Sequence, residues 1–200
     1  MRPFVSGLVL AAGTSSRLGR PKPLLPFGET TVLGRVLSRV QAAALDEIVV
    51  VLGAAAVEIR REVDLRGVTV AENPDFAEGC ATSYRTGLEA LDPRAQAVAV
   101  LLADQPGIET ASIDAVLAAW RRRPSEIALA SYRDRAGHPL VFARPLFAPL
   151  AELRGDKAAW KIVDAHPEWV QTVSLDRPAP ADLNTWEAYE AASTAARITS

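Results

Sequence analysis

A loop rich in small residues and positive charge follows the first apolar run of the chain. Residues 13–22 read Gly-Thr-Ser-Ser-Arg-Leu-Gly-Arg-Pro-Lys. Small residues let backbone N–H groups approach a phosphate closely, and Arg17 and Lys22 add positive charge. The loop lacks the Gly-Lys-Ser/Thr end of a Walker A motif, and the spacing of Gly13 and Gly19 does not fit the dinucleotide fingerprint. By spacing alone, an anion-binding loop and an ordinary charged connection are equally consistent with it.

A carboxylate stands at the end of another apolar run. Asp104 directly follows residues 97–103, which read Ala-Val-Ala-Val-Leu-Leu-Ala. An ionised carboxylate in that position is costly to desolvate unless it meets a cation. Mg²⁺ in proteins prefers one or two carboxylates together with phosphate oxygens. Asp104 is therefore a candidate metal ligand, and a turn or helix-capping residue before Pro106 is the alternative.

Short apolar runs alternate with helix-like segments over the first 122 residues. The pattern predicts strands at 7–12, 46–52, 68–71 and 97–103, and helices at 31–44, 54–63, 81–91 and 108–122. Nearly continuous apolar strands spaced by helices are typical of a parallel sheet covered on both faces. Ligands of such sheets bind at the carboxyl ends of the strands, where the loop and Asp104 would lie.

The second half of the chain is less regular. We expect strands at 127–132 and 139–142, paired around 134–137, helices at 145–153 and 157–165, a last strand at 170–174 and a terminal helix at 185–195. Internal repeats and a linker are not apparent. The sequence thus predicts a single α/β domain over residues 1–200, with a doubly wound, mostly parallel sheet and helices on both faces.

Composition narrows the class of protein. The chain has 200 residues, 49 % hydrophobic and 23 % charged, with a formal net charge of -2, which argues against a general nucleic-acid binder. Its single cysteine, Cys80, excludes an intramolecular disulfide and a multi-cysteine zinc site, and is expected to be a small packed side chain. We expect a cytoplasmic protein, because the sequence has neither a signal-peptide pattern nor a membrane-length apolar run.

Several motifs, in order, resemble those of the MobA-like nucleotidyltransferases. Residues 10–27, Leu-Ala-Ala-Gly-Thr-Ser-Ser-Arg-Leu-Gly-Arg-Pro-Lys-Pro-Leu-Leu-Pro-Phe, are similar to the signature loop of that family, and within it to the molybdenum cofactor cytidylyltransferases. Residues 73–83 resemble its N-P-x-W-x-x-G-x-x-x-S segment, and residues 101–106 its L-L-x-D-x-P motif. Residues 137–139 resemble its G-N/H-P turn, 155–157 its G-D-K and 182–185 its D-x-D-T segment.

This resemblance implies a Rossmann-like nucleotidyltransferase fold and a Mg²⁺-dependent reaction. CMP would pass from CTP to a molybdopterin-type acceptor, with pyrophosphate as the leaving group and a molybdenum hydroxylase as a possible client. Residues 1–107 would bind the nucleotide and residues 108–200 the acceptor, without a role for nucleic acid or membrane. The Pro-Leu-Leu segment at 23–25 accompanies CTP use in relatives, whereas guanylyltransferases carry a second glycine in the first loop.

The resemblance also implies roles for individual residues. Catalysis would rest on Lys22, Arg17 and Asp104. The nucleotide would contact Leu10, Ala11, Ala12, Gly13, Thr14, Ser15, Arg17, Lys22, Leu25, Gly79 and Ser83. The acceptor would contact His138, Asp156 and Lys157, and the metal would be held by Asp104, with Asp182 and Asn184 approaching it.

Some of these roles have plain structural alternatives. Ser83 could instead bond its own helix backbone, and Asp156 could cap a helix. His138 could act as a general base, although a shaping role in the acceptor site fits the turn better.

Two departures from the family pattern keep other functions open. Trp160 stands where relatives carry arginine after G-D-K, and Asn184 replaces an aspartate. A different phosphorylated acceptor such as a sugar phosphate, GTP in place of CTP, and a non-catalytic cofactor-binding partner of a molybdenum enzyme therefore remain alternatives.

Overall fold

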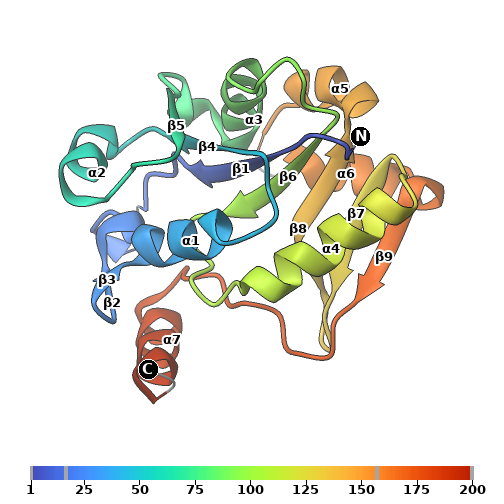
Figure 1. The fold of residues 1–200 in the computed structure, drawn as a ribbon. Helices are drawn as coiled ribbons and strands as arrows, with labels where there is room; N and C mark the ends of the chain where they lie inside the picture. The colour runs from blue at the N-terminus through green and yellow to red at the C-terminus, as the bar shows by residue number, and fades with distance from the viewer. Residues whose placement is uncertain (1, 16–17, 156–157, 199–200) are drawn as a thin grey trace.

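A seven-stranded sheet forms the centre of the molecule (Figure 1). The computed structural model describes residues 2–15, 18–155 and 158–198. The strand order is β5-β4-β1-β6-β8-β7-β9, and β8 alone runs antiparallel to its neighbours. The strands are β1 (Val5–Ala11), β4 (Glu47–Leu52), β5 (Thr69–Glu72), β6 (Ala97–Leu102), β7 (Ile127–Ser131), β8 (Ala136–Ala143) and β9 (Val170–Ser174). The predicted doubly wound, mostly parallel sheet is confirmed.

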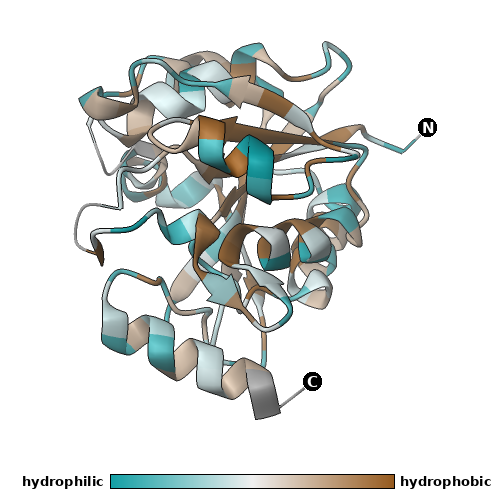
Figure 2. Cartoon of the chain, turned by 90° about the vertical axis from the view of Figure 1, so that its left-hand side faces the viewer, coloured by the Kyte–Doolittle hydropathy of each residue, from teal (hydrophilic) through white to brown (hydrophobic). Residues whose placement is uncertain are grey.

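Helices cover both faces of this sheet, as the apolar strands require. One face packs against α1 (Val32–Gln41), α2 (Ala56–Glu62) and α4 (Thr110–Arg122). The other packs against α3 (Cys80–Glu89), α5 (Phe147–Ala151) and α6 (Ala158–Ala165). Alternation along β1 divides the side chains, with Val9 facing the first helix layer and Leu8 and Leu10 facing the second. Figure 2 shows the resulting apolar strands inside and polar segments on the helix surfaces.

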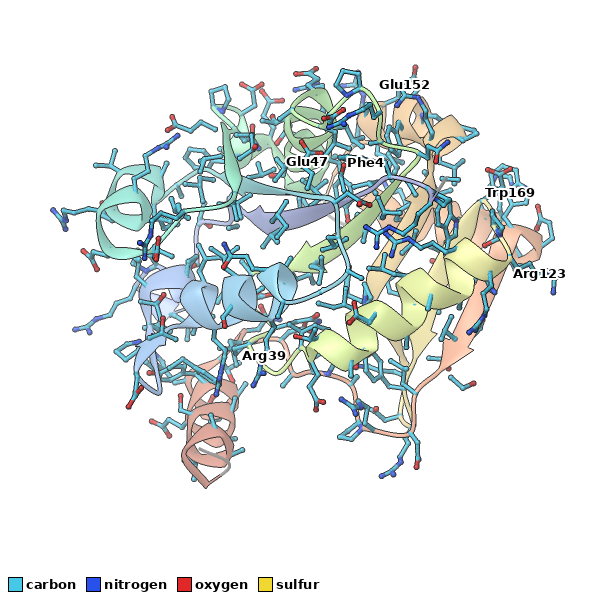
Figure 3. The ribbon with its side chains drawn as sticks, in the orientation of Figure 1. Phe4, Arg39, Glu47, Arg123, Glu152 and Trp169 are labelled. Carbon is cyan, nitrogen blue, oxygen red and sulfur yellow. The ribbon has the colours of Figure 1, made fainter. Side chains whose placement is uncertain are left out.

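Charged side chains on the helices point away from the sheet. Arg39 on α1 and Arg123 at the end of α4 are exposed, as Figure 3 shows.

None of the helices in the described ranges combines the length and apolar character needed to cross a bilayer.

The terminal helix α7 (Trp186–Ile198) lies outside these two layers. It packs against a small hairpin of β2 (Pro26–Phe27) and β3 (Thr30–Thr31), where the Tyr189 hydroxyl donates to the Pro26 carbonyl at 2.6 Å (Figure 1). The sequence did not predict this hairpin, because two-residue strands carry no detectable period. The helix predicted over 145–153 is also interrupted, because a 3-10 turn, η4 (Arg144–Leu146), precedes α5.

Two glycines allow the close packing that shapes the carboxyl end of β1. A Cβ on Gly87 of α3 would lie 2.4 Å from the Leu8 Cδ1 atom, so α3 lies directly against β1. A Cβ on Gly53, after β4, would lie 2.6 Å from the Ala12 carbonyl oxygen and 2.8 Å from Phe76 Cβ. Gly87 thus lets α3 pack closely on β1, and Gly53 lets the end of β4 approach both Ala12 and Phe76.

The strand order reverses at β1. The chain passes from β1 to β4 and β5 on one side and then returns to β6 on the other. Such a switch point leaves a crevice outside the carboxyl ends of the two strands, because the connecting segments run in opposite directions. The loops that follow β1 and β6 border this crevice.

Candidate functional site

A cavity of about 390 Å³ opens at the carboxyl ends of β1 and β6. Its walls come from the loop after β1, the end of β6, the 3-10 turn η3 (Phe76–Glu78) and the first turns of α3. The lining residues are Leu10, Ala11, Ala12, Gly13, Thr14, Ser15, Lys22, Pro23, Phe76, Ala77, Gly79, Cys80, Ser83, Leu102, Ala103 and Asp104. Most of the residues predicted to contact a nucleotide therefore line one cavity.

The loop after β1 is closed on itself by Ser15. This residue has a φ of 54°, in the left-handed region that is uncommon for residues with a side chain. Its Oγ accepts a hydrogen bond from the Lys22 backbone N–H at 2.9 Å, and its carbonyl accepts from Leu18 N–H at 3.0 Å. These bonds fix where Lys22 leaves the loop. Among the described residues, no atom lies within 4 Å of the position that a Cβ on Gly13 would take, so a ligand can approach this backbone closely.

Lys22 joins three segments that are distant in sequence. Its Nζ donates to Asp104 Oδ2 at 2.7 Å and to Asn184 Oδ1 at 3.0 Å. The backbone supports this arrangement, because the Leu183 N–H donates to the Asp104 carbonyl at 3.0 Å. Two side-chain oxygens thus converge on one cation beside the loop.

Asp182 lies in a separate polar group. Its Oδ1 accepts from Gln105 Nε2 at 2.7 Å and its Oδ2 from Arg135 at 3.4 Å. Arg135 also donates to the Pro180 carbonyl at 2.7 Å. Both Asp182 oxygens are therefore engaged away from the Lys22 ammonium, so the structure does not bring Asp182 together with Asp104 and Asn184.

The donor set by the cavity fits a divalent cation that also binds phosphate. Within the described residues, no group of three or more His, Cys, Asp or Glu side chains could hold a metal. Asp104 and Asn184 offer one carboxylate and one amide oxygen, and Mg²⁺ commonly takes few protein ligands and completes its shell with phosphates and water.

The wall opposite the loop is fixed by hydrogen bonds from Asn73. Ser83, 4 % exposed, presents its hydroxyl at the cavity, and its Oγ accepts from Asn73 Nδ2 at 3.0 Å. Gly79, the residue directly before α3, has a φ of 111°, a conformation that favours glycine. The structure shows no bond from Ser83 to its own helix backbone among the described residues. Sequence reasoning missed Asn73, although it is the first residue of the segment that resembles N-P-x-W.

One predicted contact residue, Leu25, does not line the cavity. Leu25, expected to contact the nucleotide, is instead 4 % exposed in an apolar cluster with Leu18, Phe27, Val32 and Leu183, where it supports the loop from below. Cys80 lines the cavity and is partly buried against the core, as expected of a small packed side chain. Arg17, Asp156 and Lys157 fall outside the described residues.

His138 is buried beside Trp160, away from the cavity lining. Its ring meets the Trp160 ring edge-on at 6.3 Å between centroids, and its carbonyl accepts from the Tyr132 hydroxyl at 2.6 Å. The pKa of His138 is lowered to about 4, chiefly by burial; Asp182 opposes this shift and Arg135 adds to it. A neutral ring with so low a pKa is poorly matched to general-base work near neutral pH, which favours a shaping role.

Comparisons with known proteins identify relatives of the chain. The MobA-like NTP transferase domain matches residues 7–170. The chain is 31 % identical to the nicotine blue oxidoreductase of Paenarthrobacter nicotinovorans, over 92 % of this chain and 94 % of that protein. It is 27 % identical to the molybdenum cofactor cytidylyltransferase of Escherichia coli (strain K12), over 69 % of each.

Among solved structures, a manganese complex of Rv0371c from Mycobacterium tuberculosis H37Rv is 36 % identical, with a TM-score of 0.86 over 96 % of this chain and 98 % of that one. The matched domain spans the cavity, both of its strands and most of the second half of the chain. The chain is therefore a nucleotidyltransferase that belongs to the MobA-like NTP transferase family.

Proposed function

We propose that this nucleotidyltransferase moves CMP from CTP to a phosphorylated acceptor of the molybdopterin type and releases pyrophosphate. The observation that carries the proposal is the convergence of Lys22, Asp104 and Asn184 beside the Gly13 to Ser15 backbone, at the mouth of a cavity of about 390 Å³. This combination offers one cation, two oxygens of the kind that bind metals and a stretch of backbone that lines the cavity.

The reaction requires positioning and charge neutralisation. An oxygen of the acceptor phosphate forms a bond to the α-phosphorus while the bond from that phosphorus to the pyrophosphate oxygen breaks. Lys22 and Arg17 would neutralise the triphosphate and the charge that develops on the transferred group. Asp104 and Asn184 would hold Mg²⁺, which supplies further charge neutralisation when bound. Lys22 would have to leave Asp104 as the nucleotide enters, because its ammonium occupies the space between the two oxygens.

Cytosine is supported by the sequence of the nucleotide half. Ala12 occupies the position where guanylyltransferases carry a second glycine, and Leu24 and Leu25 follow the pattern of cytidylyltransferases. Isothermal titration of the protein with CTP, GTP and ATP in the presence of Mg²⁺, and in parallel Mn²⁺, tests this point. A clear preference for GTP or ATP would overturn the choice of CTP.

The acceptor half favours a second candidate, transfer to a different phosphorylated molecule. Trp160 replaces a family arginine and lies edge-on to the neutral His138 ring, so this part of the protein presents aromatic surface instead of a cation. The relative at 31 % identity is also named for an oxidoreductase activity. Pyrophosphate release with CTP and molybdopterin, compared with other phosphate esters, decides between the acceptors.

Asp104→Ala separates catalysis from mere binding. We expect the variant to keep the fold, because the Asp104 side chain is partly exposed, and to lose pyrophosphate release. If the wild type binds nucleotide and acceptor without releasing pyrophosphate, the protein is a non-catalytic cofactor-binding partner.

A further inference from the structure

Both hydrogen-bonding atoms of the Asn73 side chain have partners. The residue is 2 % exposed, and its backbone N–H donates to the Leu52 carbonyl at 2.8 Å. Its Oδ1 accepts from the Asp75 backbone N–H at 3.0 Å. Its Nδ2 donates to Thr82 Oγ1 at 2.8 Å and to Ser83 Oγ at 3.0 Å.

The Asp75 backbone N–H fixes the orientation of the Asn73 amide. Because a backbone N–H can only donate, the atom that faces it must be the amide oxygen. Turning the amide over would set two donors against each other at this buried position, which costs about 1–3 kcal/mol for the unsatisfied group. The NH₂ group must therefore face Thr82 and Ser83, and its two protons serve one hydroxyl each.

This orientation determines where the Ser83 proton goes. The Thr82 hydroxyl, after accepting from Asn73, can donate to the Gly79 carbonyl at 2.9 Å or the Asp75 carbonyl at 3.1 Å. Ser83 also accepts from Asn73, but among the described residues its hydroxyl proton has no acceptor. Since Ser83 lines the cavity, the remaining direction for that proton is into it.

We propose that Asn73 is a positioning residue that holds the Ser83 hydroxyl as a hydrogen-bond donor to an acceptor atom of the nucleobase. The cations Lys22 and, by prediction, Arg17 belong to the loop wall, whereas the wall that carries Ser83 is built largely from Phe76, Ala77 and Cys80, which suits a flat base. A carbonyl or unprotonated ring nitrogen is favoured there, and an amino group is rejected, because a buried donor that meets another donor loses its partner. This inference rests on the proposed nucleotide function and adds how the base is read.

Two substitutions reverse or remove the donor. Asn73→Asp keeps the shape and the bond from the Asp75 N–H, but places a carboxylate oxygen where the NH₂ group was, so the Ser83 hydroxyl turns inward to donate. Ser83→Ala removes the hydroxyl. We expect each to weaken binding of the preferred nucleoside triphosphate by on the order of tenfold. The double variant should be no weaker than either single variant, because both changes remove the same bond.

The experiment is isothermal titration of the whole protein with CTP, UTP, GTP, ATP and inorganic tripolyphosphate in the presence of Mg²⁺. The variants should lose affinity for the preferred nucleotide and show a flatter preference among the four bases, while tripolyphosphate binds as to the wild type. Thr82→Val is the matched control, because it removes the other hydroxyl that Asn73 serves and should lower the melting temperature without changing base preference.

The outcomes separate this inference from the proposed function. If the wild type binds no nucleoside triphosphate, the proposed function fails and the inference fails with it. If the wild type binds a nucleotide and Ser83→Ala binds it equally well, the inference alone is wrong, whatever the behaviour of Asn73→Asp. An equal loss for all four nucleotides would place the contact on the ribose, and an equal loss of tripolyphosphate would place it at the phosphates; each result contradicts reading of the base.

Discussion

Acid should destabilise this protein through His138 at a pH where its carboxylates are still ionised. Burial lowers the pKa of His138 from 6.5 to about 4. Above pH 6.5 the ring is neutral in the folded and unfolded chain, so it adds no pH dependence. Between pH 6.5 and 4 the unfolded chain binds a proton that the folded chain does not, so the free energy of unfolding falls as the pH falls.

The size of this effect follows from the gap between the two pKa values. At about 1.4 kcal/mol for each pKa unit, the full loss is on the order of 3 kcal/mol, and about 2 kcal/mol of it should be reached by pH 5. That is a large part of the stability of an ordinary domain. The charged groups that face the ring, Asp182 and Arg135, act in opposite directions, so burial dominates.

Urea denaturation followed by tryptophan fluorescence at pH 8, 7, 6 and 5 measures the effect. His138→Asn is the matched variant, because asparagine is the other residue that this turn carries in the family pattern and it does not titrate. The variant should lose about 2 kcal/mol less than the wild type between pH 8 and pH 5. Equal losses in the two proteins would refute the reasoning, whatever their difference in stability at pH 8.

Three further substitutions test the cavity itself. Gly13→Ala should leave the melting temperature unchanged, because no atom of the residues that the structure describes lies within 4 Å of its Cβ position. It should weaken nucleotide binding by tenfold or more (about 1.4 kcal/mol) in isothermal titration. Gly53→Ala, its control, should instead cost about 1–3 kcal/mol in urea denaturation, because the new methyl group would press on Ala12 and Phe76. Lys22→Met should weaken nucleotide binding by roughly ten- to a hundredfold. The same variant should bind Mn²⁺ more tightly in the absence of nucleotide, because no ammonium is paired with the Asp104 carboxylate. Electron paramagnetic resonance of free Mn²⁺ measures this affinity. Unchanged Mn²⁺ affinity in Lys22→Met would show that Asp104 and Asn184 are not a metal site.

The sheet and the loop could be predicted because their physics is local. Continuous apolar runs over β1, β4 and β6 indicate strands buried on both faces, and each run ends where polar or small residues begin. The carboxyl ends of parallel strands share one edge of a sheet, so the loop after β1 and Asp104 after β6 had to meet. The position of Lys22 near Asp104 could be predicted because Lys22 belongs to the same loop.

Buried polar contacts between distant segments could not be predicted in this way. Asn73 binds Ser83, which lies 10 positions away, and Gln105 binds Asp182, which lies 77 positions away. A single buried amide leaves no periodic pattern in the sequence that would reveal such a partner. For Leu25 the sequence suggested a ligand contact where the structure shows packing. Its position in the motif is typical of cytidylyltransferases, but its side chain lies in an apolar cluster beside the loop. A residue shared with a family can be retained for supporting a site without touching the ligand.

The segment that returns to the site after β9 shows how the structure divides the work of two similar residues. At the end of β6, Asp104 faces the Lys22 ammonium while its neighbour Gln105 donates to Asp182. Leu183, fully buried, separates Asp182 from Asn184 and bonds through its N–H to the Asp104 carbonyl. The Asn184 N–H donates to the Asp182 carbonyl at 2.8 Å, a bond between residues two apart that is typical of a tight turn, and the two side chains bind different partners. The replacement of the family aspartate by Asn184 lowers the negative charge at the cation without removing its oxygen. Asp182, bound to Arg135, links the position of that oxygen to the half of the chain that we propose to bind the acceptor.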